Sequence, residues 1–270
     1  MLFRSSIKPF AILSVLAGLG ALVAAAAGLF APNFYPLTGG LLTGAWAQDV
    51  IALVAGALLL IVAPAARRGS ARAVAVWGGC LGYLIYGYLL YTFDAVYTAL
   101  FPLYIAILGL SVYSLIGLLT RLDPAAFRAR VGERAPARFM AVVLAIPLPL
   151  IPVWVMFVLQ GVAAGAPAAI NSVLVIDLSF VIPACLLTAV LVWRRQTWGF
   201  LFAGLLLAKM TTMGVSLALA TFWARAAFGT PVDPVQTPVY AAFAVLGGLA
   251  LALFLRALSG ADERRPALAV

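Results

Sequence analysis

The sequence predicts an all-α protein, a polytopic membrane bundle of eight transmembrane helices. Of its 270 residues, 66% are hydrophobic and only 9% are charged, whereas soluble globular chains carry about 25% charged residues. Uncharged stretches recur that are long enough to cross a bilayer, whose hydrocarbon core of roughly 30 Å needs about 20 residues. Between these stretches the basic residues form short clusters, as the positive-inside rule describes.

The first expected helix follows the basic segment MLFRSSIK and resembles a signal peptide. Its apolar run exceeds the roughly 7–15 residues of a signal-peptide core, so we interpret it as an uncleaved span. The third carries Gly78 and Gly82, a GxxxG spacing that favours close helix packing within the monomer. Prolines should bend the fifth helix within IPLPLIP and the sixth at Pro183. The eight helices are expected, in order, at 9–31, 47–66, 73–93, 97–120, 139–160, 170–193, 198–224 and 237–257.

The charge pattern predicts the orientation. Fifteen of the seventeen basic residues fall on one side of the predicted membrane, Arg225 falls on the other, and Lys209 lies within a span. This asymmetry places both termini in the cytoplasm and the protein in the cytoplasmic (inner) membrane. The connector 120–138 is interpreted as a solvated linker with a short amphipathic helix, or alternatively as a docking site for anionic lipid headgroups. Tryptophan belts are expected at Trp46, Trp154 and Trp223 outside, and at Trp77, Trp193 and Trp198 inside.

The spacing of charges also predicts an internal repeat, with residues 1–129 and 130–270 as two parallel four-helix units. Asp49 lies 18 residues before Arg67, and Asp177 lies 17 residues before Arg194. Four spans per unit give both units the same orientation in the membrane. The repeat would pair Gly18 and Gly20 with Pro147 and Pro149, where helices bend. Chance similarity of helix-end charges is the alternative.

Lys209 lies in the apolar stretch LLLAKMTTMG and needs a partner. At about 1.5 Å per residue it lies roughly 21 Å beyond Arg195, and Asp177 lies roughly 25 Å beyond Arg194 on the preceding helix. The short connector makes these helices neighbours, so we expect the two side chains to meet. An unpaired charge at this depth costs about 2.5–3.5 kcal/mol.

Three interpretations of Lys209 stay open. In the first the pair is structural, in the second it binds a solute, ion or proton, and in the third Lys209 snorkels without a partner. Lysine, unlike arginine, can lose its proton when buried. Tyr86 lies at the same height, within a run of tyrosines that form either a hydroxyl-lined wall or a packing surface. The candidate substrate or ion site comprises Lys209, Asp177, Asp49, Tyr86 and Asn171.

Several functional classes are disfavoured. The chain has no histidine, and its two cysteines lie in apolar segments, so no metal or cofactor is expected. The net charge of +9 is distributed as topology requires, which argues against nucleic acid. Retinal binding disagrees with the helix count, and no Walker loop or nucleophile elbow is present. We predict a small transporter or channel-like protein rather than an enzyme, with the bilayer and a small solute or ion as partners. The alternative is a non-catalytic scaffold or sensor subunit in which Asp177–Lys209 is structural.

Overall fold

The computed structural model describes residues 2–168, 170–234 and 236–258, and every regular element in these ranges is a helix. Eight helical segments within them are long and apolar enough to cross a membrane. The predicted all-α fold with eight apolar spans is confirmed. The helices are α1 (Lys8–Phe30), α2 (Gly39–Arg67), α3 (Ala71–Phe93), α4 (Phe101–Arg121), α5 (Pro124–Arg128), α6 (Ala137–Ala145), α7 (Leu150–Ala164), α8 (Asn171–Ile176), the π-helix η1 (Asp177–Val181), α9 (Ile182–Trp193), α10 (Thr197–Phe228) and α11 (Gln236–Ala257).

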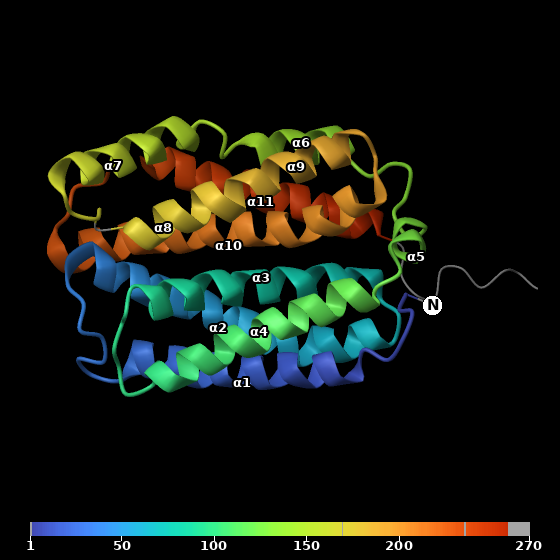
Figure 1. Cartoon of the computed structure of the whole chain (residues 1–270), viewed down its shortest axis with the longest axis horizontal. Coiled ribbons are helices and arrows are strands. Elements are labelled where there is room, and N and C mark those ends of the chain that lie inside the picture. The colour runs from blue at the N-terminus through green and yellow to red at the C-terminus, as the bar shows by residue number, and fades with distance from the viewer. Residues whose placement is uncertain (1, 169, 235, 259–270) are drawn as a thin grey trace, which may run out of the picture.

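The helices form two groups that lie side by side along the long axis of the molecule (Figure 1). In the first group α1 packs against α2 and α4, and α3 packs against the same two helices. In the second group α9 contacts α6 and α10, and α10 packs along α11. The groups meet mainly through α10, which contacts both α2 and α3.

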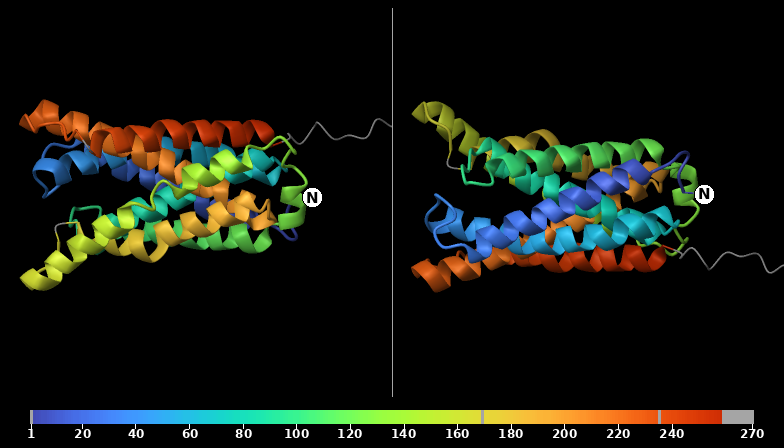
Figure 2. Two further views of the ribbon diagram at one scale, coloured as in Figure 1. Left: turned by 90° about the horizontal axis from the view of Figure 1, so that it is seen from above. Right: turned by 90° about the horizontal axis from the view of Figure 1, so that it is seen from below.

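The two ends of the bundle differ, and we name them from their residues. The arginine end, near the label N in Figure 1, comprises residues 2–7, 68–70, 122–136 and 194–196. The distal end comprises residues 31–38 and 94–100 and the turns that follow α7 and α10. Figure 2 shows that α7 and the α10–α11 turn diverge from each other at the distal end. The bundle is therefore compact at the arginine end and opens towards the distal end.

Small residues let α3 and α10 approach closely. A Cβ added to Gly79 would lie 2.5 Å from the Cβ of Ala208, and one added to Gly204 would lie 3.0 Å from that of Ala75. Gly78 and Gly82 both face Leu205 of α10. The GxxxG spacing thus serves packing inside the monomer, as predicted.

The first helix is not interrupted at its glycines, unlike the fifth span at its prolines. α1 is continuous from Lys8 to Phe30. Gly18 faces Gly56 of α2, and a Cβ on either residue would come within 2.9 Å of the carbonyl oxygen of the other. Gly18 therefore sets the close α1–α2 contact instead of providing a hinge.

Two spans begin more than two residues away from their predicted starts. α2 starts at Gly39, eight residues before the expected start, after Thr38 in extended backbone and with Gly39 at φ +55°. α4 starts at Phe101, because a turn with Ala95 at φ +53° occupies the preceding segment. Hydropathy alone therefore misplaced both boundaries.

The fifth and sixth spans are irregular, as their prolines predicted. The fifth is divided into α6 and α7 by a break at residues 146–149, which contain Pro147 and Pro149. The sixth changes from α8 to η1 and back to α9, whose first turn contains Pro183. Proline has no N–H to donate to the preceding turn, so the helix upstream must rearrange its hydrogen bonds. Both irregular spans lie in the second group.

The connector between the two groups is a packed cap and not the solvated linker that the sequence suggested. Phe127 and Leu122 are 0% and 1% exposed, and Val131 is also buried. Asp123 accepts hydrogen bonds from the backbone N–H groups of Ala125 and Ala126, which starts the short helix α5. Of the features predicted for this connector, the short helix is confirmed and the solvated linker is not. Its arginines fit a folded cap because the apolar side chains between them point into the bundle.

Arginines of this end donate hydrogen bonds to backbone carbonyls in the connectors and at the end of α11. Arg72 Nε donates to the carbonyl oxygens of Leu255 and Leu258, at 2.9 and 2.8 Å. Arg121 donates to the Ser6 carbonyl at 2.9 Å, and Arg195 to the Glu133 carbonyl at 3.1 Å. The last carbonyls of a helix lack partners within it. Besides marking topology, these arginines therefore hold both ends of the described chain against the cap.

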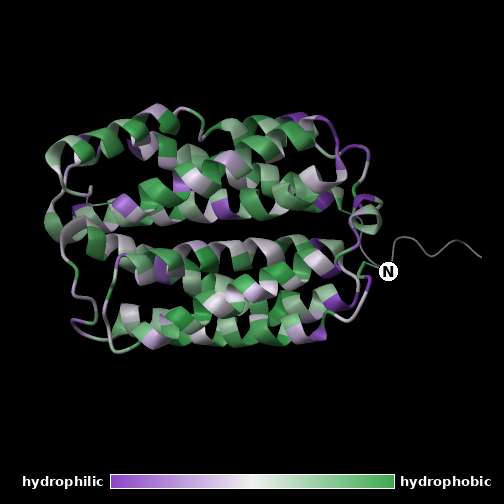
Figure 3. Cartoon of the chain, in the orientation of Figure 1, coloured by the Kyte–Doolittle hydropathy of each residue, from purple (hydrophilic) through white to green (hydrophobic). Residues whose placement is uncertain are grey.

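The long sides of the bundle are apolar. Large hydrophobic side chains are exposed along them, among them Ile61 at 67%, Phe222 at 66% and Val162 at 74%. In Figure 3 hydrophobic colour covers the helices, while hydrophilic residues gather at the arginine end and in the connectors. An apolar band of this extent would be an aggregation surface in water, and it suits a lipid environment.

Reporter fusions test this topology. A fusion after Gly132 lies in the cap at the arginine end, and one after Gly229 lies at the distal end. With eight spans the two reporters should be on opposite sides of the membrane, as measured with a paired phosphatase and fluorescent-protein assay. A fusion after Gly69 is the control and should match Gly132. Reporters at Gly132 and Gly229 on the same side would contradict the arrangement.

Candidate functional site

Four helices bring a buried polar cluster together between the two groups. Asp177 is the first residue of η1, Lys209 is in the middle of α10, Tyr86 is on α3 and Trp154 is on α7. Asp177 and Lys209 are 6% and 8% exposed, and Tyr86 is 6% exposed. Three of the four helices belong to the second group, and α3 belongs to the first. The cluster therefore joins the two groups.

Asp177 is the centre of the cluster. Its Oδ1 lies 4.0 Å from the Lys209 ammonium nitrogen and accepts a hydrogen bond from the Tyr86 hydroxyl at 3.3 Å. Its Oδ2 accepts one from the Trp154 indole N–H, also at 3.3 Å. Both carboxylate oxygens thus have partners, and the predicted meeting of Asp177 with Lys209 is confirmed.

Lys209 is held by charge and by an aromatic face. Its Nζ lies 3.8 Å from the centroid of the Tyr86 ring, within the range of a cation–π interaction. The alternative in which Lys209 snorkels without a partner is wrong. At 4.0 Å, however, the ion pair is longer than the roughly 2.7–2.9 Å of a direct charge-assisted hydrogen bond. Ammonium and carboxylate are close neighbours that do not share a proton.

The π-helix has a local cause and a local effect. Pro183 follows η1 by two residues and has no N–H to donate. The hydrogen bonds of the preceding turn shift to the π-helical spacing, in which the Ile182 N–H donates to the Asp177 carbonyl. Single π-turns within α-helices are rare and often occur at functional sites. Here the wide turn begins at Asp177, whose side chain meets α3, α7 and α10. The sequence signalled a bend through Pro183 but not the π-turn.

Two tryptophans depart from the predicted belts. Trp154 was expected at the outer interface, but its indole N–H donates to Asp177 inside the cluster. Trp77 was expected at the inner interface, but it is 0% exposed and donates to Ser14 at 2.8 Å. A tryptophan has one N–H, and a buried polar partner determined its direction in both cases.

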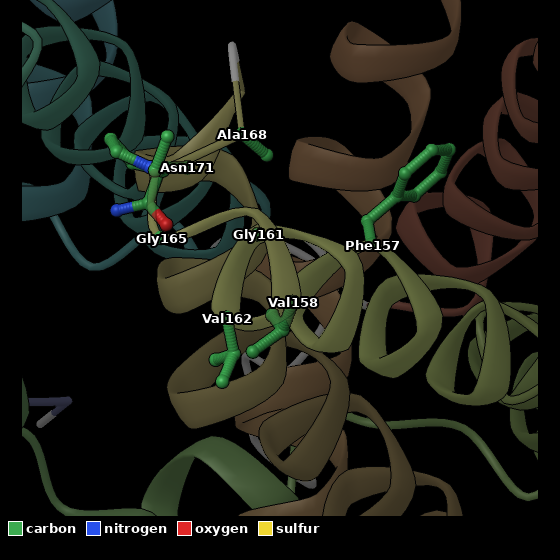
Figure 4. A pocket seen from close by; sticks show the side chains of 9 residues that line it. Phe157, Val158, Gly161, Val162, Gly165, Ala168 and Asn171 are labelled. Atoms are coloured by element: carbon green, nitrogen blue, oxygen red, sulfur yellow. The ribbon is translucent and has the colours of Figure 1, made fainter.

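Asn171, another candidate, does not join the cluster. It is exposed, and its side chain forms no hydrogen bond with another described residue. It lines a shallow pocket of about 280 Å³ at the turn between α7 and α8, together with Phe157, Val158, Gly161 and Val162. Figure 4 shows Val158 and Val162 next to each other on α7, with Asn171 on the other side of the turn. Asn171 is the one polar side chain in this described lining.

The pocket and the cluster share two elements. Phe157 and Val158 follow Trp154 on α7 by about one turn, and Asn171 precedes Asp177 by six residues, about 9 Å along the helix. Trp154 is therefore on the helix that lines the pocket and donates to the carboxylate of the cluster. The α7–α8 turn that carries the pocket lies at the distal end, where α7 diverges from the α10–α11 turn (Figure 2).

Asp49 occupies a separate buried site in the first group. It is 1% exposed, and its Oδ2 accepts a hydrogen bond from the Tyr35 hydroxyl at 2.6 Å. Its Oδ1 lies 3.2 Å from the Tyr91 hydroxyl. Burial and the nearby Asp49 raise the pKa of Tyr35, so this hydroxyl keeps its proton and donates. The structure does not bring Asp49 into contact with the Asp177–Lys209 pair.

The tyrosines of α3 divide between bonding and packing. The Tyr86 hydroxyl donates a hydrogen bond to Asp177, and the Tyr91 hydroxyl donates one to Asp49. Tyr83 donates to the Gln48 carbonyl at 2.7 Å. The Tyr88 hydroxyl has no hydrogen-bond partner among the described residues, and its ring packs against those of Tyr91 and Tyr104. Neither predicted alternative, a hydroxyl wall or a packing surface, describes the whole set.

Tyr35 and Trp154 are the polar partners that sequence reasoning missed. Tyr35 lies in the connector between α1 and α2, outside the predicted spans. The one signal in the sequence for its contact with Asp49 was the short separation of 14 residues. Among the described residues, no group of three or more histidine, cysteine, aspartate or glutamate side chains is placed to hold a metal ion. Comparison of the chain with protein-family models, curated proteins and solved structures gives no match.

A double-mutant cycle tests the ion pair. Asp177→Asn and Lys209→Met should each lower the free energy of unfolding by on the order of 3 kcal/mol, because each leaves one buried charge unpaired. The double variant should recover most of this loss. Thermal unfolding in detergent measures the effect.

Lys8→Met is the matched control, because Lys8 is the only other lysine and is exposed at the arginine end. It should leave the unfolding temperature unchanged. Losses for Asp177→Asn and Lys209→Met that simply add in the double variant would show that the two residues do not interact.

Proposed function

We propose that the protein is a small membrane transporter that moves a small charged solute or ion past the Asp177–Lys209 pair. One observation carries the proposal: a buried ion pair that is not closed by a direct hydrogen bond, at a π-helical turn. Each partner retains capacity to bind a third group, the carboxylate a cation and the ammonium an anion. Irregular helices beside intramembrane charges are typical of transporter binding sites.

The surroundings of the pair support a route from the distal end. The pocket at the α7–α8 turn is lined by α7, which carries Trp154, and by Asn171, six residues before Asp177 in the same span, and Trp154 donates to Asp177. Rotation of the Trp154 side chain away from Asp177 would break one hydrogen bond and expose the Oδ2 atom towards the pocket. Trp154 would thus act as the gate on the distal side.

The choice of lysine also supports exchange over a permanent structural link. Lys209 and Lys8 are the only lysines, while the chain uses fifteen arginines elsewhere. Arginine keeps its proton under all conditions, whereas a buried lysine can release one. A pair that only held helices together would gain more from the two parallel hydrogen bonds that an arginine offers to a carboxylate.

A second candidate function remains, a scaffold or sensor subunit in which the pair is structural. The burial of both side chains favours it, as does the position of the described pockets at the two ends of the bundle and not beside the pair. A scaffold needs the two charges to be neutralised and nothing more. The two functions therefore differ in what the double variant can do.

We further propose that both termini face the cytoplasm of a bacterial-type inner membrane, because the basic residues concentrate at the arginine end. Residues 1–129 and 130–270 are proposed as a parallel duplication. In support, Asp49 and Asp177 are 128 residues apart, and each contacts a side chain of the span that follows its own, Tyr91 of α3 and Lys209 of α10. Superposition of residues 9–120 on 139–257 should place Asp49 within one helical turn of Asp177. A larger separation would contradict the duplication.

Transport assays on purified protein in proteoliposomes test the function. Solid-supported-membrane currents would be recorded with amino acids, monocarboxylates, polyamines and alkali-metal cations in turn. We expect a current with one of these classes, and we expect the Asp177→Asn/Lys209→Met double variant to lose it at least tenfold while remaining folded. Lys8→Met is again the control and should keep the current.

Two results would contradict the transporter. The first is the absence of current with every class of solute from protein whose fold is verified by its unfolding temperature. The second is a double variant that is stable and transports as well as the unaltered chain, because it has no charge left at the site.

A further inference from the structure

Asp49 is a second buried carboxylate, and the Asp177–Lys209 pair does not use it. It lies on α2 and is enclosed by Gly28 of α1, by Tyr35 of the connector that follows, and by Tyr91 of α3. A Cβ at Gly28 would overlap Asp49 Oδ2 and the Tyr35 hydroxyl. The missing side chain at Gly28 therefore makes the space in which the carboxylate and the hydroxyl meet.

Among the described residues, no cation neutralises this carboxylate. No lysine or arginine in the described part of the chain forms an ion pair with Asp49. The titratable groups that face it are hydroxyls, and α1 contributes none. They are Tyr35 from the connector, Tyr83, Tyr88 and Tyr91 from α3, and Tyr104 from α4.

Helix α10, which also packs against α2, does not supply a cation either. Of its two basic residues, Lys209 is beside Asp177, and Arg225 is exposed in the last helical turn. A buried and uncompensated carboxylate is strongly disfavoured, and the simplest compensation is a proton.

The hydrogen-bond geometry accommodates both protonation states. The Tyr91 hydroxyl lies 3.2 Å from Asp49 Oδ1 and 3.1 Å from the carbonyl oxygen of Ala45, so its single hydrogen has two acceptors. When Asp49 is ionised, Tyr91 donates to Oδ1. When Oδ1 carries a proton, Asp49 donates to Tyr91, and Tyr91 donates to Ala45. Tyr35 donates to Oδ2 at 2.6 Å in both states.

We propose that Asp49 is a proton-binding site that loads and releases one proton at Oδ1, with Tyr91 as the hydroxyl that changes its acceptor. One O–H bond forms on Asp49 when a proton arrives from water, and the same bond breaks on release. Only the Tyr91 hydrogen turns, and no heavy atom has to move. A role for Asp49 as the coupling site of a proton-driven transporter rests on the proposed function. Proton binding by Asp49 does not depend on that function.

Tyr35 indicates the side from which the proton comes. It lies at the distal end, between α1 and α2, and its hydroxyl is 3.4 Å from that of Tyr91 as well as bonded to Asp49. Asp49 is ten residues into α2, about 15 Å from the start of that helix. The two hydroxyls therefore connect the carboxylate towards the distal end, away from the arginine cap.

Infrared spectroscopy of the full-length protein in lipid tests the site directly, with the proton as the probe. A protonated carboxylic acid has a C=O stretching band that disappears on ionisation and shifts in D₂O. We expect one such buried band, lost as pH rises through a single midpoint. Asp49→Asn should abolish it, whereas the control Asp94→Asn should not, because Asp94 is exposed in the α3–α4 turn.

Tyr91→Phe provides a second variant that keeps the carboxylate. It removes a hydrogen bond that the ionised form needs, so the midpoint should move to higher pH by about one pH unit. This result identifies the band even if Asp49→Asn does not fold. An unchanged midpoint in Tyr91→Phe would overturn the role of Tyr91 as the exchanging hydroxyl.

Two other outcomes would overturn the proton assignment. One is a spectrum without any pH-dependent carboxylic acid band that Asp49→Asn or Tyr91→Phe alters. The other is a midpoint that moves to lower pH when sodium chloride replaces choline chloride, since a metal cation would then compete for the carboxylate. Because the band is measured without a solute, loss of the transport proposal would leave this result unaffected.

Discussion

A carboxylate inside an apolar bundle must be satisfied by groups from other helices, and this constraint organises the protein. The backbone of an apolar span satisfies itself, so helices in lipid need little from each other. Asp49 and Asp177 change this, because each requires donors that its own helix does not supply. Helix α3 provides a tyrosine hydroxyl to each of them, Tyr91 to Asp49 and Tyr86 to Asp177. Its position between the two groups follows from that double demand and from the glycines that let α10 approach.

Much of the architecture was predictable because its causes are local. Span number follows from length and hydropathy, and the breaks in the fifth and sixth spans follow from proline. The contact of Asp177 with Lys209 followed from depth and from a short connector. The partners Trp154 and Tyr35 were not predictable in this way, because their directions depend on where a distant acceptor lies. Periodicity places a side chain on a helix face, but only packing shows which carboxylate it reaches.

The cap at the arginine end shows a second limit of sequence reasoning. Its arginines fit the positive-inside rule, and a polar connector with prolines at its ends is typical of a solvated linker. Yet Phe127 is fully buried, and Arg72 and Arg121 of the same end donate to the Leu255 and Ser6 carbonyls. The same residues can mark topology and close the fold. The distribution of charges along the sequence predicts the topology but not the contacts that close the fold, because hydrogen bonds to backbone carbonyls have no sequence signature.

The division of the fifth span gives α7 an unusual freedom. Its 15 residues follow the break at Pro147 and Pro149, none of them is buried, and its packing partner is α8. In a bilayer, hydrocarbon chains would surround most of α7, and the tilt of such a segment follows the local thickness of the bilayer. Trp154 lies on this segment, so a change of tilt would alter its hydrogen bond to Asp177. Membrane thickness and lateral pressure would then change how strongly the Asp177 carboxylate is hydrogen-bonded. Lipid composition would in this way influence the environment of the buried charge.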